Sequence, residues 1–178
     1  MGLTRTVVWM LPALFAASAG FADWRSRRIP NWLTLSGLAL GILVNSLTRG
    51  WLGAKDSLLG AGLGLALLLP FVLIRSLGAG DWKMVGALGA FLGPAHLIAV
   101  LFATMLVAGF MALVLVIWKR RMGQTLRNIA HMFGAVFSFR SPGPEVSLDN
   151  PDALKVPFGV AAAIAVLLHT AGRFWGIT

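Results

Sequence analysis

The chain of 178 residues contains no cysteine, only six acidic residues and only three histidines. The absence of cysteine excludes disulfides, cysteine nucleophiles, thiolate zinc sites and iron–sulfur clusters. The histidines, His96, His131 and His169, are widely separated along the sequence, so a histidine metal site is not expected. We therefore predict neither a metal nor a cofactor.

Charged residues are also scarce, at 12% of the chain, whereas 58% of the residues are hydrophobic. A soluble globule needs more polar surface than this, so we expect the protein to reside in a lipid bilayer. The net charge is +9, but the Lys and Arg residues lie between apolar runs. That distribution is typical of membrane topology and contact with anionic lipid, and we predict no nucleic-acid partner.

Several apolar runs are long enough to cross roughly 30 Å of hydrocarbon, which predicts an all-α, polytopic membrane bundle of about six transmembrane helices. The predicted spans are 7–22, 32–48, 58–75, 83–93, 96–118 and 156–172. The fourth is short and rich in glycine. Gly93-Pro94 interrupts the run from Met84 to Trp118, so this run forms either two helices or one kinked helix. A single membrane domain, 1–178, accounts for the whole length.

The positive charges orient the predicted spans. With six crossings, 11 of the 15 Lys and Arg residues fall on one side and 4 on the other, as expected when the first side is cytosolic. Both termini are then outside, and the long polar segment 119–155 is a cytosolic loop. The alternative for the first run is a secretory signal cleaved after Ala17-Ser18-Ala19. One arginine precedes that run and three follow it, which favours a retained span.

Within the loop, apolar residues recur at helical spacing from Met122 to Phe133. This pattern predicts either a basic amphipathic helix on the cytosolic surface or a continuation of the fifth span. From Ser138 to Asp152, prolines and scattered acids are typical of an irregular loop.

Two of the acids lie at predicted membrane boundaries on the same, cytosolic, side: Asp23 directly after the first span and Asp81 directly before the fourth. A carboxylate at membrane depth is costly, so each is a functional candidate. The alternative is that each marks a helix end in water. If the two carboxyl groups approach closely, they share one proton. The ionised member can then activate water against a peptide carbonyl while the protonated member stabilises the oxyanion, which is aspartyl proteolysis.

The neighbouring residues support this hypothesis. Gly78 and Gly80 precede Asp81 and permit the close backbone approach that binding of an extended peptide needs. Pro30 and Asn31 follow Asp23 and are predicted to start the second helix. Lys83 has two interpretations: it acts on the carboxyl pair or on a substrate carbonyl, or it snorkels at a helix start. Trp24, Trp32 and Trp82 are expected to anchor the protein at the interface.

Three motifs in order resemble the type IV prepilin peptidase family of GxGD membrane aspartyl proteases. They are Asp23 with the following Arg27-Arg28-Ile29-Pro30-Asn31, then Gly78-Ala79-Gly80-Asp81 with Lys83, and Lys155-Val156-Pro157-Phe158-Gly159 before an Ala-rich helix. Phe158 stands where many relatives have tyrosine.

The resemblance implies that the protein removes the short basic leader from prepilins at the cytosolic face of the bacterial inner membrane. It implies that Asp23 and Asp81 are the catalytic pair and that a prepilin is the substrate partner. Because the chain lacks the cysteine zinc domain of longer members, it looks like the short, peptidase-only form of Flp or tight-adherence pilus systems. The resemblance names neither the pilin nor the oligomeric state.

Two hypotheses of other classes stay open. Membrane aspartates also serve as proton relays, so a small proton-coupled carrier is possible, although no inverted repeat is visible and both acids lie at one edge. A non-catalytic assembly subunit is the other.

Overall fold

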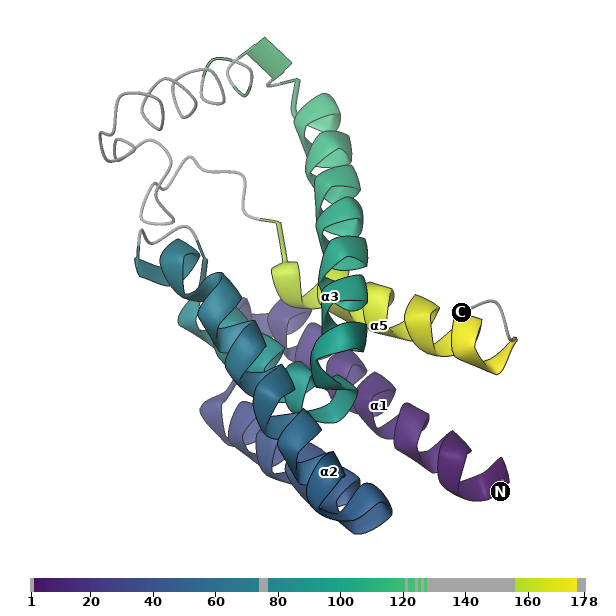
Figure 1. The fold of residues 1–178 in the computed structure, drawn as a ribbon. Helices are drawn as coiled ribbons and strands as arrows, with labels where there is room; N and C mark the ends of the chain where they lie inside the picture. Colours follow the sequence, from purple (N-terminus) through teal and green to yellow (C-terminus); the bar gives the residue numbers. More distant parts are fainter. Residues whose placement is uncertain are drawn as a thin grey trace.

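The computed structural model describes residues 2–73, 77–120, 122, 123, 125, 127 and 156–175. The elements are α1 (Gly2–Ser26), α2 (Asn31–Leu73), α3 (Ala79–Trp118) and α5 (Phe158–Phe174), shown in Figure 1. The described part is thus all-α, as predicted. Apart from four single positions, the predicted surface helix and loop between Met122 and Asp152 lie outside the described residues.

Helices α2 and α3 contain 43 and 40 residues, about twice the length that one membrane crossing needs. Each is broken at a glycine with positive φ: Gly50 (φ 60, ψ −143) and Gly93 (φ 72, ψ 173). Glycine adopts these angles without steric penalty. Figure 1 shows the chain reversing direction at both points, so each helix consists of two arms. The run from Met84 to Trp118 therefore forms two helical stretches, one of the two predicted alternatives.

The arms of α2 are 31–49 and 51–73, and those of α3 are 79–92 and 94–118. With α1 and α5 they make six helical stretches, which correspond in order to the six apolar runs of the sequence. Both α2 and α3 are long and apolar enough to cross a membrane, and the shorter α5 is also apolar.

The most apolar 18-residue stretches of α2 and α3 are largely exposed on the outside of the bundle. Only 28% and 17% of their residues are buried, unlike the core helices of a soluble protein. Large side chains such as Leu47, Phe102 and Phe110 are more than 60% exposed. A surface of this kind is suited to lipid.

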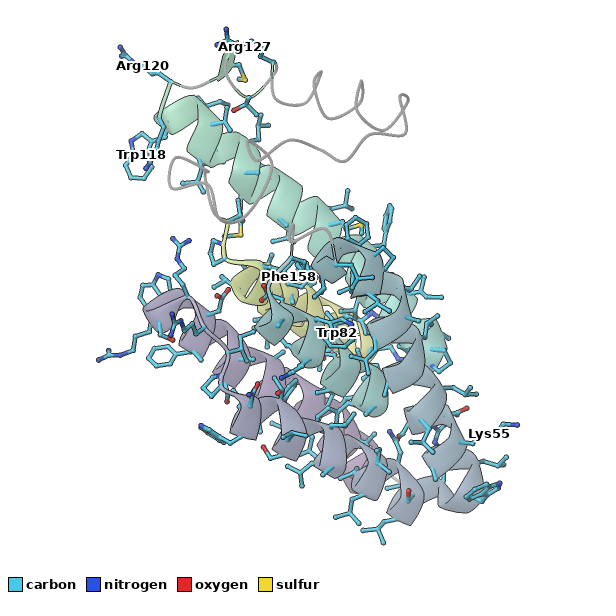
Figure 2. The ribbon with its side chains drawn as sticks, turned by 90° about the vertical axis from the view of Figure 1, so that its left-hand side faces the viewer. Lys55, Trp82, Trp118, Arg120, Arg127 and Phe158 are labelled. Atoms are coloured by element: carbon cyan, nitrogen blue, oxygen red, sulfur yellow. The ribbon has the colours of Figure 1, made fainter. Side chains whose placement is uncertain are left out.

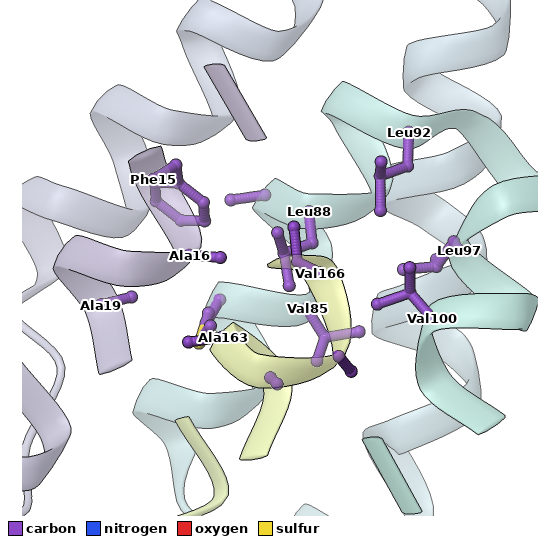
Figure 3. Close-up of a cluster of buried hydrophobic side chains, with 14 of the residues drawn as sticks. Phe15, Ala16, Ala19, Val85, Leu88, Leu92, Leu97, Val100, Ala163 and Val166 are labelled. Atoms are coloured by element: carbon purple, nitrogen blue, oxygen red, sulfur yellow. The ribbon is translucent and has the colours of Figure 1, made fainter. Parts of the chain in front are cut away.

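The helices pack in two pairs, α1 with α5 and α2 with α3, and α5 also contacts α3. Figure 3 shows the core that joins the pairs. Its labelled members are Phe15, Ala16 and Ala19 of α1, Val85, Leu88, Leu92, Leu97 and Val100 of α3, and Ala163 and Val166 of α5.

Backbones approach closely where the second arm of α2 crosses the first arm of α3. A Cβ atom built on Gly60 would collide with the carbonyl oxygen of Gly89, and one on Gly89 would collide with that of Gly60. Beside this crossing, buried Asn45 donates from Nδ2 to Ser57 Oγ (2.9 Å) and to the Ala90 carbonyl (2.9 Å). Small residues and interhelical hydrogen bonds are the usual means of joining helices in lipid.

The two reversals lie at the same end of the molecule, since Gly93 lies against Asp56, a few residues after Gly50. The end of α1 and the starts of α2, α3 and α5 meet at the opposite end, where the contacts described below connect them.

The Gly60–Gly89 crossing predicts that Gly60→Ala lowers the free energy of unfolding by about 1–3 kcal/mol, because two backbones must separate. Gly62→Ala is the matched control, since a Cβ there meets nothing within 4 Å. It should leave stability unchanged or raise it by up to about 1 kcal/mol through helix propensity. Thermal unfolding in detergent measures both variants, and equal midpoints would contradict the prediction.

Candidate active site

Asp23 lies in the last turn of α1 and is 6% exposed. The helix ends shortly afterwards because Arg27 adopts a left-handed conformation (φ 53), while its N–H bonds the Asp23 carbonyl (2.8 Å). The side chain of Asp23 is held by α5: the backbone N–H of Gly159 donates to Asp23 Oδ2 (2.9 Å). Gly159 is in the first turn of α5, where backbone N–H groups have no partner within the helix.

The approach of Gly159 to Asp23 depends on the absence of a side chain. A Cβ atom on Gly159 would lie 2.9 Å from Asp23 Cβ and 3.0 Å from Oδ2. Residue types alone did not reveal this donor. The sequence signal was the Pro157-Phe158-Gly159 motif, whose role the sequence left unassigned.

Asp81 lies inside the first turn of α3, which begins at Ala79, rather than directly before the helix as expected. Gly78 is the N-cap residue, and the Asp81 carboxylate accepts a hydrogen bond from its backbone N–H. This is the acidic half of a capping box. A Cβ on Gly78 would lie 3.0 Å from Asp81 Oδ2, so glycine leaves room for the carboxylate to fold back over the helix start.

The structure brings the two selected acids together. Asp23 and Asp81 lie close enough for their carboxylates to interact electrostatically, although one ends α1 and the other begins α3. The third acid among the described residues, Asp56, pairs with Arg49 (2.8 Å) near the helix reversals. The structure therefore separates an isolated surface ion pair from a carboxylate pair at the other end.

The supporting residues predicted from the sequence lie in the segments that follow Asp23 and precede or follow Asp81. The Pro30 carbonyl accepts from the N–H groups of Leu33 (3.1 Å) and Thr34 (3.3 Å), so α2 begins at Asn31, as predicted. Gly80 packs on the turn that follows α1, where a Cβ would lie 3.4 Å from Ile29 N, O and Cβ.

Lys83 contacts the same region. Its Nζ donates to Asn31 Oδ1 (3.0 Å), across 52 positions of sequence. The segments that follow Asp23 and Asp81 are thus in direct contact, through Asn31 at the start of α2 and Lys83, two residues after Asp81.

The tryptophans near the site differ in environment. Trp24 and Trp32 are 70% and 71% exposed, as expected for anchors at a membrane interface. Trp82 is instead partly buried and donates from Nε1 to the Leu65 carbonyl (2.7 Å), which fixes the start of α3 on the second arm of α2. Figure 2 labels Trp82 near the start of α3 and Phe158 at the start of α5.

His96 and His169 are far apart in the sequence, but the structure brings them together, with their ring centroids 5.3 Å apart. Trp9 packs on both rings, and the Arg173 guanidinium lies 4.9 Å from the centroid of a Trp9 ring. Helix α5 starts beside the end of α1 and runs back along it, which brings His169 to Trp9. Among the described residues, no group of three His, Cys, Asp or Glu side chains is placed to hold a metal ion.

Comparison with known proteins gives a family match and three related sequences. Residues 10–113, which include both acids, match the type IV leader peptidase family. The prepilin leader peptidase/N-methyltransferase of Aeromonas hydrophila is 35% identical over 120 residues, 64% of this chain and 39% of that protein. The proteins of the same name from Neisseria gonorrhoeae and Xanthomonas campestris pv. campestris are 29% and 31% identical over 123 and 119 residues.

The chain spans well under half the length of these curated relatives, 39–43% in each case. No solved structure matches it significantly. The matched segment covers more than half of the chain and contains the whole carboxylate pair with its flanking motifs, and the chain belongs to the type IV leader peptidase family.

Proposed function

We propose that this protein is a membrane aspartyl endopeptidase that removes the leader peptide from prepilins at the cytosolic face of the bacterial inner membrane. The observation that carries the proposal is that Asp23 and Asp81 lie close enough to interact electrostatically, at one end of an apolar helix bundle. The family match and the names of the three relatives support a prepilin as the substrate.

The geometry is suited to acid–base hydrolysis. Two carboxyl groups that interact in this way are expected to carry one proton between them. The ionised carboxylate takes a proton from a water molecule, and the resulting hydroxide attacks the scissile carbonyl carbon. The protonated carboxyl stabilises the oxyanion and then supplies a proton to the leaving amine. Gly159 N–H and Gly78 N–H hold the two side chains in place during these steps.

The proposed topology has six crossings with both termini outside. It is supported by the two reversals at one end of the molecule and by the positive charges that follow α1 and α3 at the other end. Figure 2 agrees with this arrangement, with Lys55 far from Trp118 and Arg120. In this topology, the carboxylate pair faces the cytosol, where a basic leader is presented.

Within this family, we propose a peptidase-only enzyme of an Flp or tight-adherence pilus system, which the sequence resemblance supports. The mass of the processed pilin tests this assignment, because a methylated N-terminus is about one CH₂ group heavier than an unmethylated one. A proton-coupled carrier or an assembly subunit would use the same acids differently, and the following substitutions distinguish these functions.

Asp23→Asn and Asp81→Asn should each lower the rate of prepilin cleavage by at least about 100-fold, the low end of what acid–base catalysis contributes. Asparagine keeps the size of the side chain and its capacity to accept a hydrogen bond, so protein levels should be unchanged. Cleavage is followed by gel shift after co-expression with a prepilin. Asp56→Asn removes an exposed acid far from the site and should cleave normally. Normal processing by either Asn variant of the pair would exclude the proposed mechanism.

The topology can be tested by cysteine labelling, because the native chain has no cysteine. Arg28→Cys and Lys55→Cys place single thiols at exposed positions on opposite ends of the bundle. An impermeant maleimide added to spheroplasts should label the Lys55→Cys protein, and the Arg28→Cys protein should react only after lysis. The reverse pattern, or equal labelling, would refute six crossings with external termini.

Gly159→Ala should lower kcat by about 10- to 100-fold, since the added Cβ displaces the Asp23 carboxylate and misplaced catalytic groups lose about this much. The unfolding temperature and protein level report whether the variant is folded. Gly109→Ala is the matched control, because a Cβ there meets nothing within 4 Å. If a folded Gly159→Ala variant retained full activity, the N–H donor would have no catalytic importance.

A further inference from the structure

The two carboxylates belong to different helix pairs. Asp23 is carried by α1, which packs mainly on α5, whereas Asp81 is carried by α3, which packs mainly on α2. Direct contact between α1 and α3 is slight by comparison. The pairs are joined along the bundle by the packing of α5 on α3, and groups that bridge them near the site add to this in setting the relative position of the carboxylates.

The turn between α1 and α2, residues 27–30, is one such bridge. The turn follows directly from α1, the helix that carries Asp23. At this junction Ser26 Oγ donates to the Ala22 carbonyl of α1 (2.8 Å) or to the Arg28 carbonyl of the turn (3.0 Å). On the other side the turn meets Gly80, the residue before Asp81, through the buried side chain and the backbone of Ile29. The distances at Gly80 are those of van der Waals contact, which limits how closely the segments approach but opposes sliding only weakly.

The hydrogen bond from Lys83 Nζ to Asn31 Oδ1 opposes that sliding. Asn31 follows the turn directly, and Lys83 is two residues after Asp81. The bond therefore ties one end of the turn to the first turns of α3. The Lys83 ammonium group donates to the neutral amide oxygen of Asn31 in the same chain. The sequence interpretations had instead placed it at the carboxyl pair, at a substrate carbonyl or at the membrane surface.

We propose that Lys83 and Asn31 are positioning residues: their hydrogen bond holds the segment that carries Asp81 against the turn that follows Asp23. The role is exerted through the carboxylates, and neither side chain needs to touch the substrate. The expected effect on the rate of prepilin cleavage rests on the proposed peptidase function. The expected effect on the position of α3 against the turn does not.

A double-mutant cycle on prepilin cleavage tests the kinetic consequence. Lys83→Met and Asn31→Ala each remove one partner, and we expect each to lower kcat by about 3- to 10-fold, the range for one hydrogen bond, with KM unchanged. The double variant should be no slower than the slower single variant, because both changes remove the same bond. Lys83→Arg keeps an N–H donor and should restore most of the rate. Lys55→Met removes a remote exposed lysine and controls for the loss of charge.

Other outcomes would overturn the proposal. Multiplied effects in the double variant, a large loss for Lys83→Met alone, or a raised KM would show that Lys83 acts on the carboxyl pair or the substrate by its charge. Wild-type kcat in both single variants would show that the bond positions nothing.

Disulfide trapping tests the structural consequence without any activity. In the cysteine-free chain, Ile29→Cys with Gly80→Cys places two Cβ atoms about as far apart as in a disulfide, since a Cβ on Gly80 lies 3.4 Å from Ile29 Cβ. Mild oxidation of membranes should cross-link this pair, and adding Lys83→Met should slow the reaction at least about 3-fold. An unchanged rate would refute the positioning role. If cross-linking behaves as expected but the wild-type protein cleaves no prepilin, only the proposed function is refuted.

Discussion

The hydrogen bond from Gly159 N–H to Asp23 Oδ2 is the contact on which the rest of the site depends. Helix α5 packs on both α1 and α3, and its first turn reaches the acid at the end of α1. Without this contact, the Asp23 carboxylate would lie at a helix C-terminus, where the nearby backbone groups are carbonyls that cannot donate to it. The donor has to come from another helix, so the location of α5 sets the location of Asp23.

Small residues make that location possible. A Cβ on Gly20 would lie 2.7 Å from Ala163 Cβ and 3.1 Å from the Gly159 carbonyl oxygen, so α1 and α5 approach almost backbone to backbone. In a bilayer, helices gain little from burying apolar side chains and associate through packing of this kind. The Ala-rich stretch after Gly159 therefore serves the site, because it brings the free N–H groups of α5 within reach of α1.

The parts of the fold that could be predicted are those encoded locally. Long apolar runs predicted the helical stretches, Gly93-Pro94 predicted a break, and Ile29-Pro30-Asn31 predicted the start of α2. The acids were identifiable because they are rare in an apolar chain, and the parity of the predicted spans placed both at one end.

The parts that could not be predicted are contacts between distant segments. The donor to Asp23 is a backbone N–H, which every residue except proline carries, so the sequence does not mark it. The Lys83–Asn31 bond and the approach of His96 to His169 depend on how helix pairs are rotated against one another. Trp82 was expected to be an interfacial anchor because its type favours that location, but its indole N–H donates to the Leu65 carbonyl of the neighbouring helix, a contact between distant segments.

Every polar group of the site comes from a helix end, and this has a physical cause. Backbone N–H groups in the first turn of a helix have no intrahelical partner, and leaving them unsatisfied next to lipid is costly. Carboxylates at the meeting point of helix starts satisfy them: Asp81 accepts from Gly78 and Asp23 accepts from Gly159. The same two bonds hold the two acids, which interact electrostatically. One arrangement therefore supplies acceptors for the free N–H groups and pairs the two acids for acid–base chemistry. This accounts for two carboxylates at this end of a bundle that is otherwise poor in acids.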